Sequence, residues 1–143
     1  MRNSDTLITH ADHRRIRSLV ARLRASGRAR ADHLAALTDR LRRSRAVNPA
    51  DIPRNVVTLN SRVALKDLDS GKRLALTLAD PHDVTLFGDR LSVAGPAGIA
   101  LLGRRVGQIV HWTLGPKARR FRVEQVLYQP EAAGDERLLR QAV

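Results

Sequence analysis

Cysteine is absent from this chain of 143 residues. That absence excludes disulfide bonds, thiol catalysis and zinc sites with cysteine ligands, and it fits a reducing compartment. No apolar run reaches the roughly 18–20 residues that span a bilayer, and the N-terminus lacks the apolar segment of a secretory signal. We therefore expect a cytoplasmic protein that no segment anchors in a membrane.

Aromatic side chains are scarce as well, because the chain has only Phe87, Trp112, Phe121 and Tyr128. Proteins that bind single strands by stacking bases on exposed rings need more of them. Three of the four fall in predicted strands, where a place in the core explains them. The Gly-Lys-Ser or Gly-Lys-Thr end of a phosphate-binding loop is also missing.

Positive charge, by contrast, is abundant and unevenly distributed. The formal net charge is +12, and arginine supplies 23 of the 26 positive side chains. Residues 1–48 carry 12 Arg and 4 Asp, so about two-thirds of the excess lies on one-third of the length. This balance indicates an acidic partner, whether nucleic acid, an anionic membrane face or an acidic protein surface, unless it only keeps the surface solvated.

Apolar residues at helical spacing predict two amphipathic helices within residues 1–48. Thr9 and Asp12 predict an N-cap with an acidic first turn, and Ser26-Gly27 ends the first helix. The second helix is expected from Ala31 or Asp32 to about residue 45. Two narrow apolar stripes that fit one another predict an antiparallel hairpin. The stripes are Ile16, Leu19, Val20 and Leu23 in the first helix and Leu34, Leu37 and Leu41 in the second.

Residues 49–143 predict a β-rich domain that contains one short helix. Turn residues separate runs of β-branched or alternating residues throughout this part of the chain. The order of elements gives the class α+β, with an antiparallel sheet wrapped over the short helix. The expected strands are residues 56–59, 62–68, 73–79, 91–93, 109–114 and 121–128, the expected helix is residues 96–102, and a last helical turn is expected at 136–141.

Three stretches of the chain closely resemble the Rnk family, the bacterial regulators of nucleoside diphosphate kinase, which are relatives of the Gre transcript-cleavage factors. They are PRNVVTLNSRV at 53–63, LSVAGPAGIALLGRRVG at 91–107 and LYQPEAAGD at 127–135. The resemblance implies an N-terminal antiparallel coiled-coil hairpin, residues 1–48, on a C-terminal domain of FKBP-like fold, residues 49–143. Prolyl isomerase activity would need an aromatic-lined pocket, for which the chain has too few rings.

The resemblance also implies that RNA polymerase is the partner, bound at its secondary channel with the hairpin pointing inward. The polymerase-facing surface then includes Ser92, Gly95 and Pro96. Gre factors usually carry a serine where this chain has Gly95. We expect a monomeric, non-enzymatic regulator that competes with Gre factors and has no cofactor or metal.

The hairpin tip, residues 26–32, carries a single carboxylate, Asp32, close to Arg28 and Arg30. Gre factors hold a catalytic Mg²⁺ with acidic residues at this place, and Mg²⁺ prefers several oxygen ligands. A basic tip predicts pairing of Asp32 with arginine and no stimulation of transcript cleavage. Asp32 is then either a polymerase contact or the N-cap of the second helix.

The hairpin arginines have two interpretations, contact with nucleic acid or the channel rim, and simple solvation. By position, the expected contacts are Arg14, Arg17, Arg24, Arg28 and Arg30. A basic nucleic-acid-binding module that acts without polymerase is the alternative function. His10 and His13 with Asp12 have the spacing of a metal site on one helix face, but histidines at a helix start are usually solvated.

Overall fold

The computed structural model describes residues 6–83, 89–114 and 116–135. Its first part is a helical hairpin made of α1 (His10–Ser26) and α2 (Ala31–Arg43). The predicted N-cap is confirmed, because the Thr9 hydroxyl accepts the backbone N–H of Asp12 at 3.0 Å. Gly27 ends α1 with a positive φ of 67°, a conformation that glycine adopts without a steric cost. The two helices are about 26 and 20 Å long at the usual rise per residue.

Two short strands that the sequence pattern did not reveal close the base of the hairpin. They are β1 (Leu7–Thr9) and β2 (Arg45–Val47), and they pair in parallel. The second helix was expected to run to about residue 45, but it ends at Arg43 because the following residues join β2. Strands of three residues are too short to show an alternating pattern.

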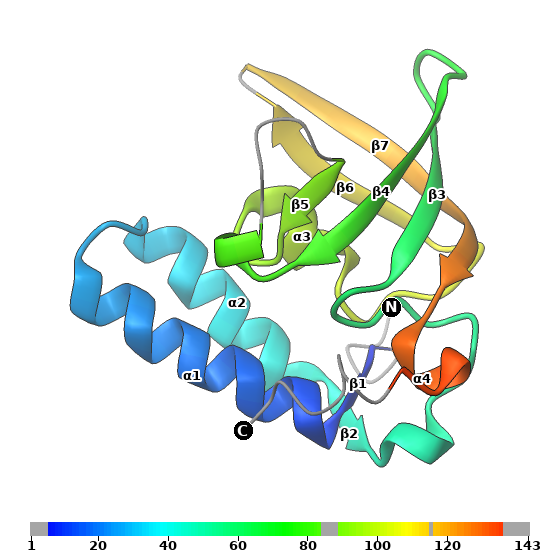
Figure 1. The fold of residues 1–143 in the computed structure, drawn as a ribbon. Coiled ribbons are helices and arrows are strands. Elements are labelled where there is room, and N and C mark those ends of the chain that lie inside the picture. The colour runs from blue at the N-terminus through cyan, green and yellow to red at the C-terminus, as the bar shows by residue number, and fades with distance from the viewer. Residues whose placement is uncertain (1–5, 84–88, 115, 136–143) are drawn as a thin grey trace.

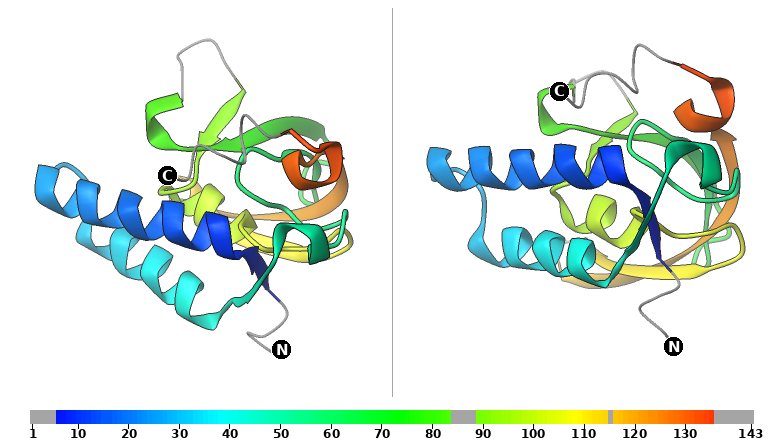
Figure 2. Two further views of the ribbon diagram at one scale, coloured as in Figure 1. Left: turned by 60° about the horizontal axis from the view of Figure 1, so that its bottom comes forward. Right: turned by 90° about the horizontal axis from the view of Figure 1, so that it is seen from below.

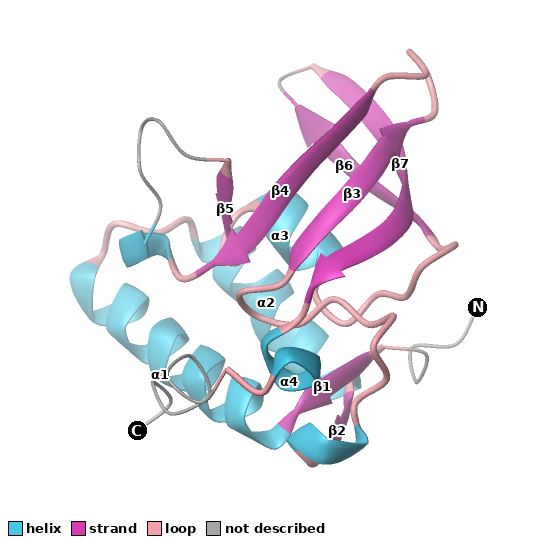
Figure 3. Ribbon diagram, turned by 45° about the vertical axis from the view of Figure 1, so that its right-hand side comes forward, coloured by secondary structure: helices cyan, strands magenta, loops and turns pink. Residues whose placement is uncertain are grey.

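The second part is a curled five-stranded sheet with the strand order β5-β4-β3-β7-β6 (Figures 1 and 3). Every neighbouring pair is antiparallel except β4 and β5, which are parallel. Short helical turns connect these strands to the hairpin and to the C-terminal segment. The elements are β3 (Arg62–Asp67), β4 (Arg73–Ala79), β5 (Arg90–Ser92), β6 (Ile109–Leu114), β7 (Lys117–Tyr128), α3 (Pro96–Leu101), α4 (Pro130–Ala133), η2 (Pro49–Asp51) and η3 (Pro81–Asp83).

The prediction of a strand at residues 56–59 is wrong. Val56 makes only an isolated bridge to Arg105, and the segment binds a loop instead of a strand. The Val57 N–H donates to the Arg104 carbonyl at 2.8 Å, and the Gly103 N–H donates to the Val57 carbonyl at 2.9 Å. The apolar run is buried within an irregular segment, which a sequence pattern does not distinguish from a buried strand.

The hairpin and the sheet share one hydrophobic core. Helix α3 lies between α2 and the sheet, and the far end of the hairpin points away from the sheet (Figures 1 and 2). Both predicted apolar stripes face this core, so the hairpin is packed on the domain along much of its length. The boundary between residues 48 and 49 stays a prediction. Buried members of the core include Ile16, Leu19, Val20, Leu34, Leu37 and Leu41 from the hairpin and Leu59, Val63, Leu65, Leu78, Leu101, Val110 and Val123 from the rest.

The predicted strand positions of three aromatic residues are confirmed. Trp112 lies in β6 and Phe121 and Tyr128 lie in β7. The Trp112 and Phe121 rings stack with centroids 4.1 Å apart, and Phe121 is buried. Phe87 and the helical turn expected at 136–141 fall outside the described residues. Among the described residues, no helix combines the length and the apolar character that a membrane crossing requires.

Candidate functional site

The tip of the hairpin is the most exposed part of the described helices. From residue 24 to residue 32 every residue is exposed except Ala29, which is half-buried. Ser26 stabilises the turn, because its hydroxyl donates to the Leu23 carbonyl at 2.8 Å and accepts the Arg28 N–H at 3.2 Å. Within this stretch Ala29 packs against the hydrophobic core, and the other side chains are exposed.

Asp32 is engaged by a neighbouring arginine at this tip. Its two carboxylate oxygens accept from Nε and an NH2 group of Arg30, each at 3.0 Å. This two-point contact holds the pKa of Asp32 down at about 2, and the backbone N–H of His33 contributes further. Pairing of Asp32 with a tip arginine was predicted from the sequence and is confirmed.

The interpretation of Asp32 as an N-cap is wrong. The N-cap position of α2 belongs to Arg30, which makes no side-chain capping bond, and Asp32 is the second residue of the helix. An N-cap side chain bonds two or three residues ahead, whereas the Asp32 carboxylate accepts the N–H of His33, its immediate neighbour, at 3.0 Å. A carboxylate in the first turn still interacts favourably with the positive end of the helix.

The five predicted arginine contacts are all exposed and fall into two groups. Arg28 and Arg30 lie at the tip, and Arg24 lies next to it in the last turn of α1. Arg14 and Arg17 lie near the base of α1, where they line a shallow hollow together with His10, His13 and Ala46. Burial and the nearby Arg17 and His10 lower the pKa of His13, so this hollow already disfavours an added positive charge.

The predicted contacts Ser92, Gly95 and Pro96 come together at the start of α3. The Ser92 hydroxyl accepts the Ala94 N–H at 3.1 Å, and its carbonyl accepts the Gly95 N–H at 3.2 Å. Gly95 is the N-cap and exposed Pro96 is the first helical residue. A Cβ atom on Gly95 would lie 3.6 Å from the Ser92 carbonyl oxygen, an ordinary contact, so the serine that Gre factors carry would fit here.

Asp12 has a structural role that its sequence pattern, an acid in the first helical turn near His10 and His13, does not indicate. Its side chain is 1% exposed, and its Oδ2 accepts the backbone N–H of Leu59 at 3.0 Å. Burial and the nearby Glu131 carboxylate together raise the pKa of Asp12 to about 7, against the lowering effects of Leu59, Arg15 and Thr9. Asp12 thus connects the base of α1 to the segment before β3.

Two of the stretches that carry the family resemblance meet in the same region. Gln129 donates to the carbonyls of Pro53 and Val56 at 2.8 and 2.9 Å. Thr58 donates its hydroxyl proton to Glu131 at 2.7 Å. The stretch 127–135 therefore holds the irregular segment 53–61 in place through side-chain hydrogen bonds. We call this contact the clamp. The same segment contains Leu59, whose N–H donates to Asp12.

No group of three or more His, Asp or Glu side chains within the described ranges is arranged to hold a metal ion. The carboxylate of Asp12, which was considered together with His10 and His13, is directed to Leu59 instead.

A helical hairpin packed on a curled sheet is the architecture that this chain shares with a solved factor of the GreA/GreB class. The family described as "Transcription elongation factor, GreA/GreB, C-term" matches residues 52–128. A solved elongation factor GreA/GreB from Nitrosomonas europaea superposes with a TM-score of 0.72 and 32% identity, over 86% of this chain and 99% of that one.

Sequence comparison gives the narrower assignment. The regulator of nucleoside diphosphate kinase of Escherichia coli strain K12 is 41% identical over 130 residues, which are 90% of this chain and 93% of the relative. A GreA factor of Thermotoga petrophila is 34% identical over 71 residues, or 50% of this chain and 46% of the relative. The chain belongs to the regulator of nucleoside diphosphate kinase family and carries a GreA/GreB C-terminal domain. These relatives are named as regulators or elongation factors, not as enzymes.

Proposed function

We propose that the chain is a non-enzymatic transcription regulator that binds RNA polymerase at the secondary channel. The sheet domain would contact the rim through the start of α3, and the hairpin tip would point inward. The Gre-type fold, the transcription-factor relatives and the exposed tip support this proposal. Competition with Gre factors for the same channel follows from the shared architecture. An effect on nucleoside diphosphate kinase, which the relative's name mentions, would be indirect.

The observation that carries the proposed mechanism is the Arg30–Asp32 pair. Stimulation of cleavage in the manner of Gre factors requires carboxylate oxygens that coordinate Mg²⁺ at the tip. Both oxygens of Asp32 already accept from Arg30. Arg28 and Arg30 also repel a divalent cation from this end of the hairpin. The protein would therefore occupy the channel without stimulating transcript cleavage.

Competition for core polymerase tests the binding mode. We expect the chain to bind core polymerase in a pull-down and a Gre factor to displace it in proportion to its concentration. A stalled elongation complex incubated with the chain should cleave its RNA no faster than without it. Binding that an excess of Gre factor leaves undisturbed, or accelerated cleavage, would reject the proposal.

Charge reversal at the tip tests whether the hairpin is a contact. The double variant R28E/R30E should weaken both polymerase binding and competition with Gre factors. A matched control is R54E/K72E, which changes the net charge by the same amount at two exposed positions away from the tip. If the two double variants behave alike, the tip is not a contact and only the net charge matters.

The exposed arginines of α1 support a second candidate function, a nucleic-acid-binding module that acts without polymerase. The chain would then bind RNA or DNA by itself, and its affinity would fall steeply as salt rises because counterions are released from the phosphates. Gel-shift titrations at several salt concentrations separate the two functions. Affinity for nucleic acid that requires polymerase favours the first.

A further inference from the structure

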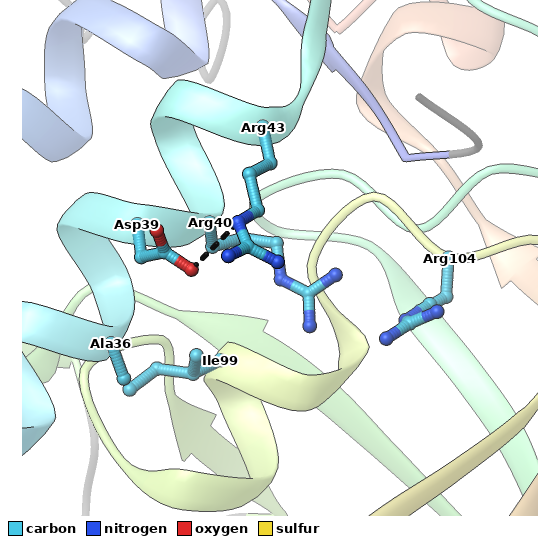
Figure 4. A pocket seen from close by; sticks show the side chains of 6 residues that line it. All are labelled: Ala36, Asp39, Arg40, Arg43, Ile99 and Arg104. Carbon is cyan, nitrogen blue, oxygen red and sulfur yellow. Dashed lines mark ion pairs between the residues drawn. The ribbon is translucent and has the colours of Figure 1, made fainter. Parts of the chain in front are cut away.

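A pocket of about 350 Å³ opens between α2 of the hairpin and α3 of the sheet domain (Figure 4). Its lining includes neither a residue of the hairpin tip nor Asp12 or Leu59, the two residues that connect the base of α1 to the segment before β3. One wall is apolar and the remainder is charged, mostly with arginine. The lining residues are Ala36, Asp39, Arg40, Arg43, Ile99 and Arg104.

The single carboxylate of the pocket is already paired. Asp39 Oδ2 lies 3.0 Å from Nε of Arg43, and Oδ1 lies 2.7 Å from an NH2 group of Arg42, which extends outward from the same helix. Among the described residues, no carboxylate lies within ion-pair distance of Arg40. The Arg40 guanidinium is thus half-buried, and the nearby Asp39 acts on it without forming an ion pair with it.

Arg40 and Arg104 face one another across the pocket although they are 64 positions apart in the chain (Figure 4). Arg104 is oriented from the turn after α3 by a bond from its Nε to the Ala100 carbonyl at 3.1 Å. Burial, together with the nearby Arg104 and Arg43 and against the effect of Asp39, lowers the pKa of Arg40 to about 10. Like charges held this close indicate a site that an anion would stabilise.

We propose that this pocket binds a compact oxyanion of the phosphate class, such as inorganic phosphate, pyrophosphate or the diphosphate group of a nucleotide. Three of the six lining residues are arginines and one is an aspartate, so guanidinium N–H donors dominate the charged part of the wall. Arginine binds phosphate oxygens with paired N–H donors in a fixed geometry. The site needs no polymerase and is independent of the function proposed above.

The recessed position favours a small anion over a polynucleotide or an acidic protein surface. The pocket lies near the lower end of the volumes found for small-molecule sites, roughly 300–1,000 Å³. Half-buried Arg40 is less accessible to an extended backbone than the exposed arginines of α1. Because the pocket lies between α2 and α3, an anion bound to Arg40 and Arg104 would also hold the hairpin against α3.

The test uses the full chain titrated with pyrophosphate in a calorimeter, followed by thermal unfolding with and without the anion. We expect measurable binding and a higher Tm in its presence, because a ligand that binds only the folded state stabilises it. R40A and R104A should each weaken pyrophosphate binding by at least about tenfold, the range for a lost charge-assisted contact. The matched control R54A, which removes one exposed charge elsewhere, should change it by less than about twofold.

A second set of variants keeps the test decisive if R40A or R104A fails to fold. R40K retains the charge but loses the two-point geometry, so it should bind pyrophosphate more weakly than the parent chain at an unchanged Tm without anion. Tighter binding of ADP than of pyrophosphate would identify a nucleotide as the source of the diphosphate, and equal binding would identify the free anion. The proposal is overturned if pyrophosphate does not bind, if R54A weakens binding as much as R40A, or if a short RNA binds through Arg40 and Arg104 more tightly than pyrophosphate.

Discussion

Two aspartates near helix starts show how differently the two ends of the hairpin are built. Asp12 lies in the first turn of α1 at the base, and Asp32 lies in the first turn of α2 at the tip. The base buries Asp12 at 1% exposure, whereas the side chain of Asp32 is 63% exposed. The pKa of Asp12 is raised to about 7, and that of Asp32 is lowered to about 2.

The difference teaches what each region does with a carboxylate. At the base, burial is the largest influence on the pKa of Asp12. Its carboxyl group accepts the Leu59 N–H, and this bond joins α1 to the segment before β3. At the tip, the hydrogen bonds from Arg30 are the largest influence on the pKa of Asp32, and the positive charge of Arg30 balances the carboxylate. The base is therefore a joint whose strength depends on protonation, while the tip is a surface whose charge is set by arginine.

The largest effect that would sharpen this contrast is expected from D12N. A carboxyl group whose pKa rises from 3.8 to about 7 on folding binds more protons in the folded state between these values. Asp12 therefore costs stability as pH rises from about 4 to about 7, by at most about 1.4 kcal/mol per pH unit. Asparagine still accepts the Leu59 N–H but does not ionise, so D12N should lose this dependence.

Urea unfolding from pH 4 to pH 8 measures the effect as the difference between the parent chain and D12N. Taking the difference is necessary because carboxylates with lowered pKa, such as Asp67 at about 2, act with the opposite sign at low pH. We expect D12N to become the more stable of the two as pH rises through this range. D32N is the matched control and should follow the parent chain above pH 5. A difference that stays constant with pH would show that folding does not raise the pKa of Asp12.

The next largest effect on stability is expected from Gln129, which holds the segment 53–61. Gln129 is 4% exposed, and Q129A would leave the Pro53 and Val56 carbonyls without their side-chain donor. We expect a loss of about 2–4 kcal/mol in the free energy of unfolding from the lost bonds and the cavity. Q125A, at an exposed position of β7, is the control and should change it by less than about 0.5 kcal/mol. Equal effects of the two would mean that the clamp does not hold residues 53–61.

Most of the fold could be predicted because its elements have patterns of sufficient length. The stripes of α1 and α2 and the alternation in β3, β4 and β6 were visible in the sequence, and the structure confirms them. The short pair β1 and β2 and the irregular run at 56–59 were not, because three residues or an unbroken apolar run carry no period.

The candidate site was predictable only where its residues are close in the chain. Arg30 and Asp32 are two positions apart, so their pairing followed from composition alone. Asp12 and Leu59 are 47 positions apart, and the bond joins a side chain to a backbone N–H, so no side-chain pattern records it. Arg40 and Arg104 meet only because α2 packs on α3. Tertiary contacts of this kind depend on the fold and leave no local signal.

The smallest effect is expected at the tip, where R30A would remove the partner of Asp32. The folded state should lose almost nothing, since pairs between exposed side chains contribute little to stability. The pKa of Asp32 should nevertheless rise from about 2 toward its ordinary value, because the arginine contact is the main cause of its depression. An NMR titration of the Asp32 carboxyl carbon measures this shift, with R24A, which removes an exposed arginine of the last turn of α1, as the control. A pKa that stays near 2 in R30A would mean that the backbone N–H of His33 and the helix start hold the carboxylate by themselves. The difference in pKa between Asp12 and Asp32 would then not depend on Arg30. The argument that Arg30 keeps the Asp32 carboxylate from binding Mg²⁺ would fail.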